Sequence, residues 1–162
     1  MRKVIYGGAC SLDGFLAGPD GAIDWLHFSK DVEAIMAQSW ATTDTILFGR
    51  KTWEGAYSQG GATSMPGMTS YVFSSTLTKL PYGSGGARLV RQDAGAFVKE
   101  LKRRPGKDMI VMSGGNLARS LLKAGGVLTN FRCGPSLAPG LRPSVHYFFK
   151  MVYGIELSFR KK

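Results

Sequence analysis

The sequence predicts an α/β protein with a largely parallel central sheet flanked by helices. Short apolar runs suited to buried strands alternate along the chain with segments of helical periodicity. Several strand-like runs end directly in glycine or serine turns that lead into a helical pattern, as in strand–turn–helix units. At 162 residues the chain is long enough for a real core. We therefore expect a single domain over residues 1–162.

Composition narrows the class of protein. The hydrophobic content of 44% is ordinary for a globular chain, and no apolar run reaches membrane-spanning length. The N-terminus lacks the hydrophobic region of a signal peptide. The two cysteines, Cys10 and Cys133, have neither metal-site spacing nor a disulfide framework. We expect a cytoplasmic protein with no membrane partner and no metal.

The net charge of +10 is concentrated toward the end of the chain. Residues 127–162 carry six lysines and arginines and a single acid, Glu156. Their net charge of +5 is half of the total. Such basicity suits nucleic acid, or an anionic cofactor together with a solvated tail. No recognisable nucleic-acid motif accompanies it. We therefore expect a small-molecule partner and keep nucleic-acid binding as the minority alternative.

The first strand is expected at Val4–Tyr6, followed by a loop over residues 11–21 that is rich in turn residues. Long ordered loops often carry function. Ser29 is a good N-cap for a helix that runs to about Trp40. Its apolar stripe is Val32, Ile35, Met36 and Trp40.

The second strand, Thr45–Phe48, runs straight into Gly49, Arg50, Lys51 and Thr52. A cation at a helix start is slightly unfavourable, and a bound anion would remove that penalty. The third strand, Tyr71–Phe73, ends in three hydroxyls, Ser74, Ser75 and Thr76. Each can donate to a phosphate oxygen, although such residues are also common in ordinary turns.

The fourth strand is expected at Arg88–Val90, and Asp93 should cap a helix over Ala94–Lys102 with Phe97, Val98 and Leu101 inward. The clearest unit follows. Met109–Met112 is a continuous apolar run, and it ends in Ser113, Gly114 and Gly115. Asn116 is the expected N-cap of the next helix, whose inward residues are Leu117, Leu121 and Leu122.

In open parallel sheets, ligands bind beyond the carboxyl ends of the strands. Three strand ends here carry residues that suit an anion, and one sheet edge would bring them together. This coincidence predicts a ligand with several phosphates, hence a dinucleotide.

The chain resembles the dihydrofolate reductase fold family, and more closely the reductase domain of the bacterial riboflavin deaminase-reductase and its stand-alone relatives. The resemblance covers residues 1 to about 126. It rests on Ser11-Leu-Asp-Gly-Phe15, Asp24-Trp25, Phe48-Gly-Arg-Lys-Thr-Trp-Glu54, Phe73-Ser-Ser-Thr-Leu77 and Ser113-Gly-Gly-Asn-Leu117.

The resemblance implies a sheet of about eight strands, NADPH as cofactor, and hydride transfer to a pterin-like or aminopyrimidine substrate. By matching motif, the cofactor-binding residues are Gly49, Arg50, Lys51, Thr52, Ser74, Ser75, Thr76, Ser113, Gly114, Gly115, Asn116 and Leu117. The third strand ends without an acid and Arg50 stands nearby, which favours NADPH over NADH. Relatives often form dimers, so a homodimer is a further expectation.

The resemblance also implies which residues form the substrate site and its lid. The loop from Asp13 to Trp25 corresponds to the family's active-site lid, and the substrate and lid residues are Ala9, Asp13, Asp24 and Trp25. The candidate proton donors are Asp31, early in the first helix, and Asp13. Each aspartate has a plainer explanation, as a helix-end charge or a turn residue.

The chain departs from the family after residue 126. Relatives continue with an Asp-Glu pair and a segment ending in Gly-x-Pro-x-Phe, whereas this chain reads Gly125-Gly-Val-Leu-Thr-Asn-Phe131. Read two bases out of frame, residues 128–131 can encode Asp-Glu-Phe. We hypothesise a frameshift near residue 126, which would leave a catalytically impaired dinucleotide-binding protein as an alternative function. A genuine tail would instead form a hairpin from 147–153 and 155–160.

Overall fold

The computed structural model describes residues 1–10, 15–19, 21–23, 30–58, 60, 66–81, 83–125 and 130–135. The chain divides into two compact units, the first made of residues 1–8 and 29–133 and the second of residues 9–28 and 134–162. In the second unit, Gly18 and Ala22 close a turn through a backbone hydrogen bond of 2.9 Å. The expectation of a single domain stays a prediction. The first unit holds the sheet and the helices described below.

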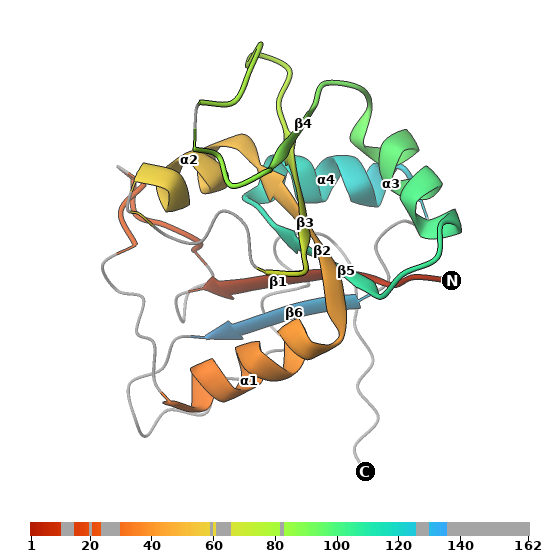
Figure 1. Cartoon of the computed structure of the whole chain (residues 1–162). Helices are drawn as coiled ribbons and strands as arrows, with labels where there is room; N and C mark the ends of the chain where they lie inside the picture. The colour runs from red at the N-terminus through yellow and green to blue at the C-terminus, as the bar shows by residue number, and fades with distance from the viewer. Residues whose placement is uncertain are drawn as a thin grey trace. The chain divides into compact units, whose positions relative to one another are not determined.

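A six-stranded sheet forms the centre of the first unit (Figure 1). Its strands are β1 (Val4–Cys10), β2 (Thr43–Gly49), β3 (Thr69–Phe73), β4 (Arg88–Val90), β5 (Asp108–Met112) and β6 (Asn130–Pro135). Their order is β4-β3-β2-β5-β1-β6, and β1 to β5 pair with one another in parallel. The predicted α/β class and parallel sheet are confirmed. The described residues hold six of the roughly eight strands that the resemblance implied.

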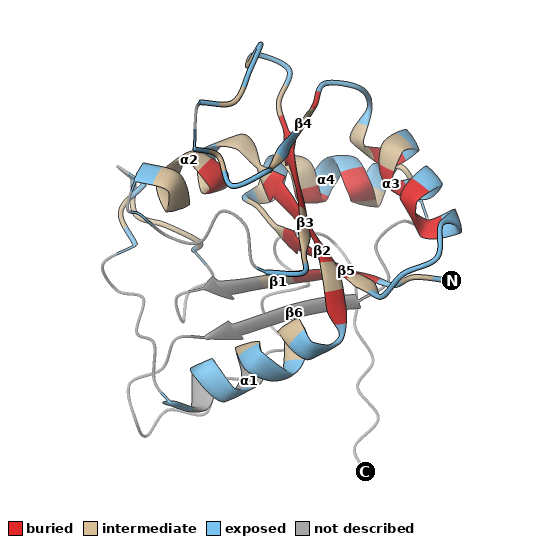
Figure 2. Ribbon diagram, viewed as in Figure 1, coloured by how far each residue is buried: buried red, intermediate tan, exposed pale blue. Residues whose placement is uncertain are grey.

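Helices cover both faces of the sheet. They are α1 (Lys30–Ala41), α2 (Arg50–Ser58), α3 (Ala94–Arg103) and α4 (Gly115–Lys123). Side chains of α3 and α4, among them Val98 and Leu121, pack with Leu47 and its neighbours on one face. On the other face, Trp53 of α2 and Trp40 of α1 pack with Ile46. The buried residues therefore lie between sheet and helices, in two layers (Figure 2).

The sequence pattern accounts for α3 directly. The carboxylate of Asp93 accepts a hydrogen bond from the Ala96 backbone N–H at 2.7 Å, so it caps the helix as predicted. Val98 and Leu101 are buried. Phe97 packs edge-to-face on Tyr71, with ring centroids 5.0 Å apart. No helix within the described ranges is long and apolar enough to span a membrane.

The start of α4 and the presence of β6 differ from the predictions. The helix α4 begins at Gly115 with Gly114 as its N-cap, so Asn116 lies inside the first turn and the predicted Asn116 cap is wrong. A glycine with extended backbone can start a helix without any side-chain cap, and a propensity argument overlooks it. The strand β6 (Asn130–Pro135) was not predicted, because its alternation is short, with Phe131 and Cys133 as its apolar residues, and it ends in Gly134 and Pro135, which are rare inside strands. The expected hairpin over 147–160 and the Ser29 cap lie outside the described residues.

Candidate functional site

The strand register brings the three candidate turns to one edge of the sheet. Gly49 pairs with Phe73 on one side, and Phe48 pairs with Met112 on the other. The residues that follow these strand ends, Arg50, Ser74 and Ser113, therefore leave the sheet from three adjacent strands, β2, β3 and β5. This is the arrangement that the sheet-edge argument required.

Gly49 lies close to Ser113, the residue that follows β5. A Cβ added to Gly49 would lie 3.0 Å from the Cβ of Ser113 and 3.5 Å from its Cα, so packing favours glycine here. The hydroxyl of Tyr6 donates a hydrogen bond of 2.6 Å to the Ser113 carbonyl, which ties the turn to β1. The Ser113 hydroxyl is buried and has no hydrogen-bond partner among the residues that the structure describes. An orphaned hydroxyl in a fixed turn is a donor available to a bound ligand.

The glycine pair leaves open space at the start of α4. Gly114 has extended backbone angles, φ −72° and ψ −178°, and neither Gly114 nor Gly115 is among the glycines with positive φ. The backbone conformation itself therefore does not require glycine at either position. A Cβ on either glycine would have no atom of the described residues within 4 Å. No side chain in the described part of the chain caps the helix, so its first N–H groups have no side-chain acceptor there.

Arg50 is held by an acid one helical turn further along α2. Its Nη1 donates to both carboxylate oxygens of Glu54, at 3.0 Å and 2.8 Å. The two side chains are 36% and 39% exposed. Because Glu54 engages only one nitrogen, the side of the guanidinium formed by Nε and Nη2 makes no hydrogen bond within the described part of the chain. That side is the fork that grips phosphate with two parallel hydrogen bonds.

The serine turn after β3 is partly structural. The Ser74 hydroxyl oxygen accepts from the backbone N–H groups of Thr76, at 3.2 Å, and Leu77, at 3.0 Å. The backbone N–H of Ser74 donates to the Val90 carbonyl at 3.1 Å. Ser74 therefore shapes the turn, while the exposed Ser75 and Thr76 are the residues that remain accessible to a ligand.

The remaining candidates divide by position. In the first turn of α2, Lys51 is exposed and Thr52 is half-buried. In α4, Asn116 is exposed and Leu117 packs against the core. Asp31 is the second residue of α1 and Ala9 lies in β1, but their side chains are outside the described part. The lid candidates Asp13, Asp24 and Trp25 also lie outside the described residues, so their roles stay predictions.

Sequence reasoning missed Tyr6 and Glu54. Glu54 follows Arg50 at the i,i+4 spacing of helical ion pairs, so the signal was present once the helix was placed. The contact of Tyr6 with Ser113 joins residues 107 positions apart, and no local pattern reveals it.

Three polar turns on adjacent parallel strands, one of them a helix start without a side-chain cap among the described residues, form the arrangement expected where α/β proteins hold dinucleotides. Residues 2–128 match the RibD C-terminal domain, and the chain belongs to that family.

Two relatives of this chain come from Bacillus subtilis (strain 168). The uncharacterized protein YwjB is 29% identical over 123 residues, covering 75% of this chain and 70% of YwjB. The uncharacterized protein YyaP is 28% identical over 136 residues, covering 77% and 70%. A crystal structure from Shewanella sp. PV-4, of a protein provisionally named for riboflavin biosynthesis, superposes with a TM-score of 0.68. It covers 84% of this chain and 78% of its own, and at 22% identity it supports the fold.

Proposed function

We propose that this protein is an NADPH-dependent reductase that transfers a hydride to a pterin-like or aminopyrimidine substrate, such as 5-amino-6-(5-phosphoribosylamino)uracil. Membership of the RibD C-terminal domain family supports a reductase of the riboflavin pathway. The observation that carries the proposal is the junction of β2, β3 and β5, where three turns offer donors to phosphate at one sheet edge.

Several residues at this edge suit the phosphates of a dinucleotide. Open space above Gly114 and Gly115 lets a diphosphate approach the uncapped N–H groups of α4. The free fork of Arg50 and the exposed hydroxyls of Ser75 and Thr76 suit a second phosphate on the ribose. No acid lies in the first turn of α2 or α4 to repel either group.

When bound, the nicotinamide ring supplies the hydride. The protein's part is to align donor and acceptor and to deliver a proton to the product. Asp31 is our first candidate for that proton, with Asp13 second, because Asp31 lies at the start of α1 and α1 follows the expected lid loop. The hydrogen bond from the Tyr6 hydroxyl to the Ser113 carbonyl holds the glycine turn in position.

The test is a titration of the purified protein with NADPH and NADH, followed by NADPH oxidation at 340 nm with pterins and phosphoribosylaminopyrimidines as substrates. Saturable NADPH binding with turnover of an aminopyrimidine is the expected result. A protein that binds neither dinucleotide would refute the proposal.

A dinucleotide-binding protein without turnover is the second candidate. The match to the family ends at residue 128, close to where the basic tail begins. A frameshift near residue 126 would explain both. Resequencing the locus tests this: an uninterrupted frame, together with relatives that share the tail, would refute the frameshift. NADPH binding without oxidation of any substrate would favour the second candidate.

A further inference from the structure

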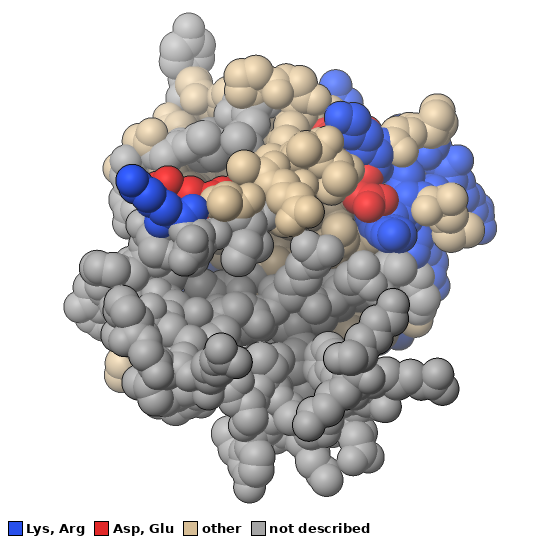
Figure 3. Space-filling view, turned by 90° about the horizontal axis from the view of Figure 1, so that it is seen from below, with Lys and Arg blue, Asp and Glu red and all other residues tan. Residues whose placement is uncertain are grey.

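A second charged region lies at the opposite edge of the sheet, where β1 and β5 begin and α3 ends. A hollow of about 440 Å³ opens there, lined chiefly by residues 102–106, Arg2 and Asp108. Four of the lining side chains are cationic and one is a carboxylate. Figure 3 shows lysine and arginine side chains gathered on the side where α3 ends and the chain begins. Because the strands are parallel, this edge is separate from the candidate cofactor edge.

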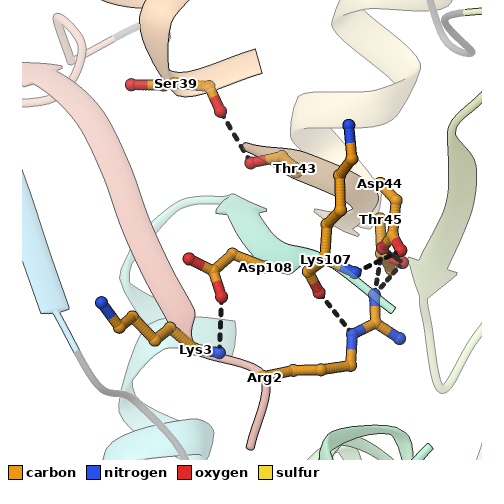
Figure 4. A network of polar contacts seen from close by, with 8 residues as sticks. All are labelled: Arg2, Lys3, Ser39, Thr43, Asp44, Thr45, Lys107 and Asp108. Atoms are coloured by element: carbon orange, nitrogen blue, oxygen red, sulfur yellow. Dashed lines mark hydrogen bonds and ion pairs between the residues drawn. The ribbon is translucent and has the colours of Figure 1, made fainter. Parts of the chain in front are cut away.

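The innermost cation of the hollow is fixed in place. The Arg2 side chain is only 8% exposed. Its Nη2 is bonded to the carboxylate of Asp44 and to the Thr45 hydroxyl, and its Nε donates to the Lys107 carbonyl (Figure 4). The third nitrogen, Nη1, makes no hydrogen bond within the described part of the chain. The Arg2 guanidinium is therefore nearly buried and held in place, and its Nη1 can donate to a ligand.

The loop over residues 104–107 is held tightly against this arginine. Gly106 has a φ of +147°, and a Cβ there would lie 2.7 Å from Asp44 Oδ2 and 2.9 Å from Arg2 Cζ. The backbone N–H of Lys107 donates to the same Asp44 oxygen at 2.7 Å. The wall of the hollow is thus preformed, and a ligand would bind without ordering it.

The neighbouring acids do not balance the lining cations. Both oxygens of the Asp44 carboxylate are occupied by Arg2, Thr45 and the Lys107 backbone. Glu100 pairs with Arg104, but both side chains are 58% exposed, and such pairs contribute little. The negative end of α3 is equivalent to about half a charge, which one cation offsets. With the lining carboxylate Asp108, three acids stand against the four lining cations, so a formal surplus of one positive charge remains.

We propose that this hollow binds a small phosphorylated anion. Arginine forks recognise phosphate with two hydrogen bonds, and Arg103 and Arg104 stand at the rim beside the buried Arg2. The volume lies in the range of small-molecule sites. The lining cations gather in one hollow rather than along a stripe, which favours a small molecule over a polynucleotide.

Calorimetric titration with inorganic pyrophosphate at constant ionic strength tests the proposal. The double variant Arg103→Ala/Arg104→Ala should weaken binding about tenfold or more, and both residues are exposed, so the fold should be retained. The matched control Arg88→Ala removes an exposed arginine from β4, outside the hollow, and should bind as wild type does.

Three results would overturn the proposal. One is the absence of saturable binding, or an equal loss in Arg88→Ala. Another is a loss confined to Arg50→Ala, which would place pyrophosphate at the cofactor edge. The last is a lower dissociation constant for a single-stranded RNA than for pyrophosphate, lost in the Arg103→Ala/Arg104→Ala variant. That result would make the region a nucleic-acid surface. None of these outcomes depends on whether the protein reduces a substrate.

Discussion

Replacing Arg50 by alanine tests the assignment of the cofactor edge to NADPH. Arg50 is tied to Glu54 through one nitrogen, which leaves its Nε/Nη2 fork for an anion. A hydrogen bond to a charged group contributes about 1.5–3 kcal/mol. Its loss corresponds to a roughly ten- to hundredfold weaker NADPH complex. Because the guanidinium is 36% exposed, solvent screening places the expected loss near the lower end, about tenfold.

The folded state should change little in the same variant, since an exposed i,i+4 ion pair contributes about 0.3–0.5 kcal/mol. The assay is a pair of dissociation constants, for NADPH and NADH, measured by fluorescence titration of wild type and Arg50→Ala. Arg88→Ala serves as the control for a lost surface charge. NADH binding should be nearly unaffected. Equal losses for the two cofactors would move Arg50 to the bridging diphosphate, and a wild-type preference for NADH would refute the reasoning.

Three further substitutions test other parts of the structure. Gly115→Val fills open space at the start of α4, so it should weaken dinucleotide binding at least tenfold without unfolding the protein; wild-type affinity would make the turn merely structural. Asp31→Asn should lower kcat at least tenfold with little change in cofactor Kd, and unchanged turnover would remove Asp31 from the mechanism. Gly106→Ala, at φ +147° and against Asp44 and Arg2, should lower the free energy of unfolding by about 1–3 kcal/mol; an unchanged urea midpoint would contradict this.

The sequence predicted the scaffold well because its signals are local. The apolar run Met109–Met112 and the capping aspartate Asp93 each specify an element from a few neighbouring residues, and both elements form. The turns that leave β2, β3 and β5 were also placed on one edge, because parallel strands share the direction of their carboxyl ends.

The details that the sequence could not supply are long-range ones. The tight packing that favours glycine at position 49 comes from Ser113, which follows another strand, β5. The acceptor role of the Ser74 hydroxyl depends on the exact path of its turn, which composition does not determine. The hollow beside Arg2 was likewise invisible, since it joins residues about a hundred positions apart.

The position of β5 has a consequence for how the protein is made. This strand lies between β1 and β2, yet it is the last of the five parallel strands to be synthesised. Until residues 108–112 leave the ribosome, β1 and β2 lack the strand that lies between them, and each has an unpaired edge where β5 will bind. A nascent chain shorter than about 112 residues would thus be prone to aggregation and would be a natural client for chaperones. The same insertion means that an N-terminal fragment ending before β5 lacks one of the three turns of the candidate cofactor edge, so binding of a cofactor there would report that β5 has joined the sheet.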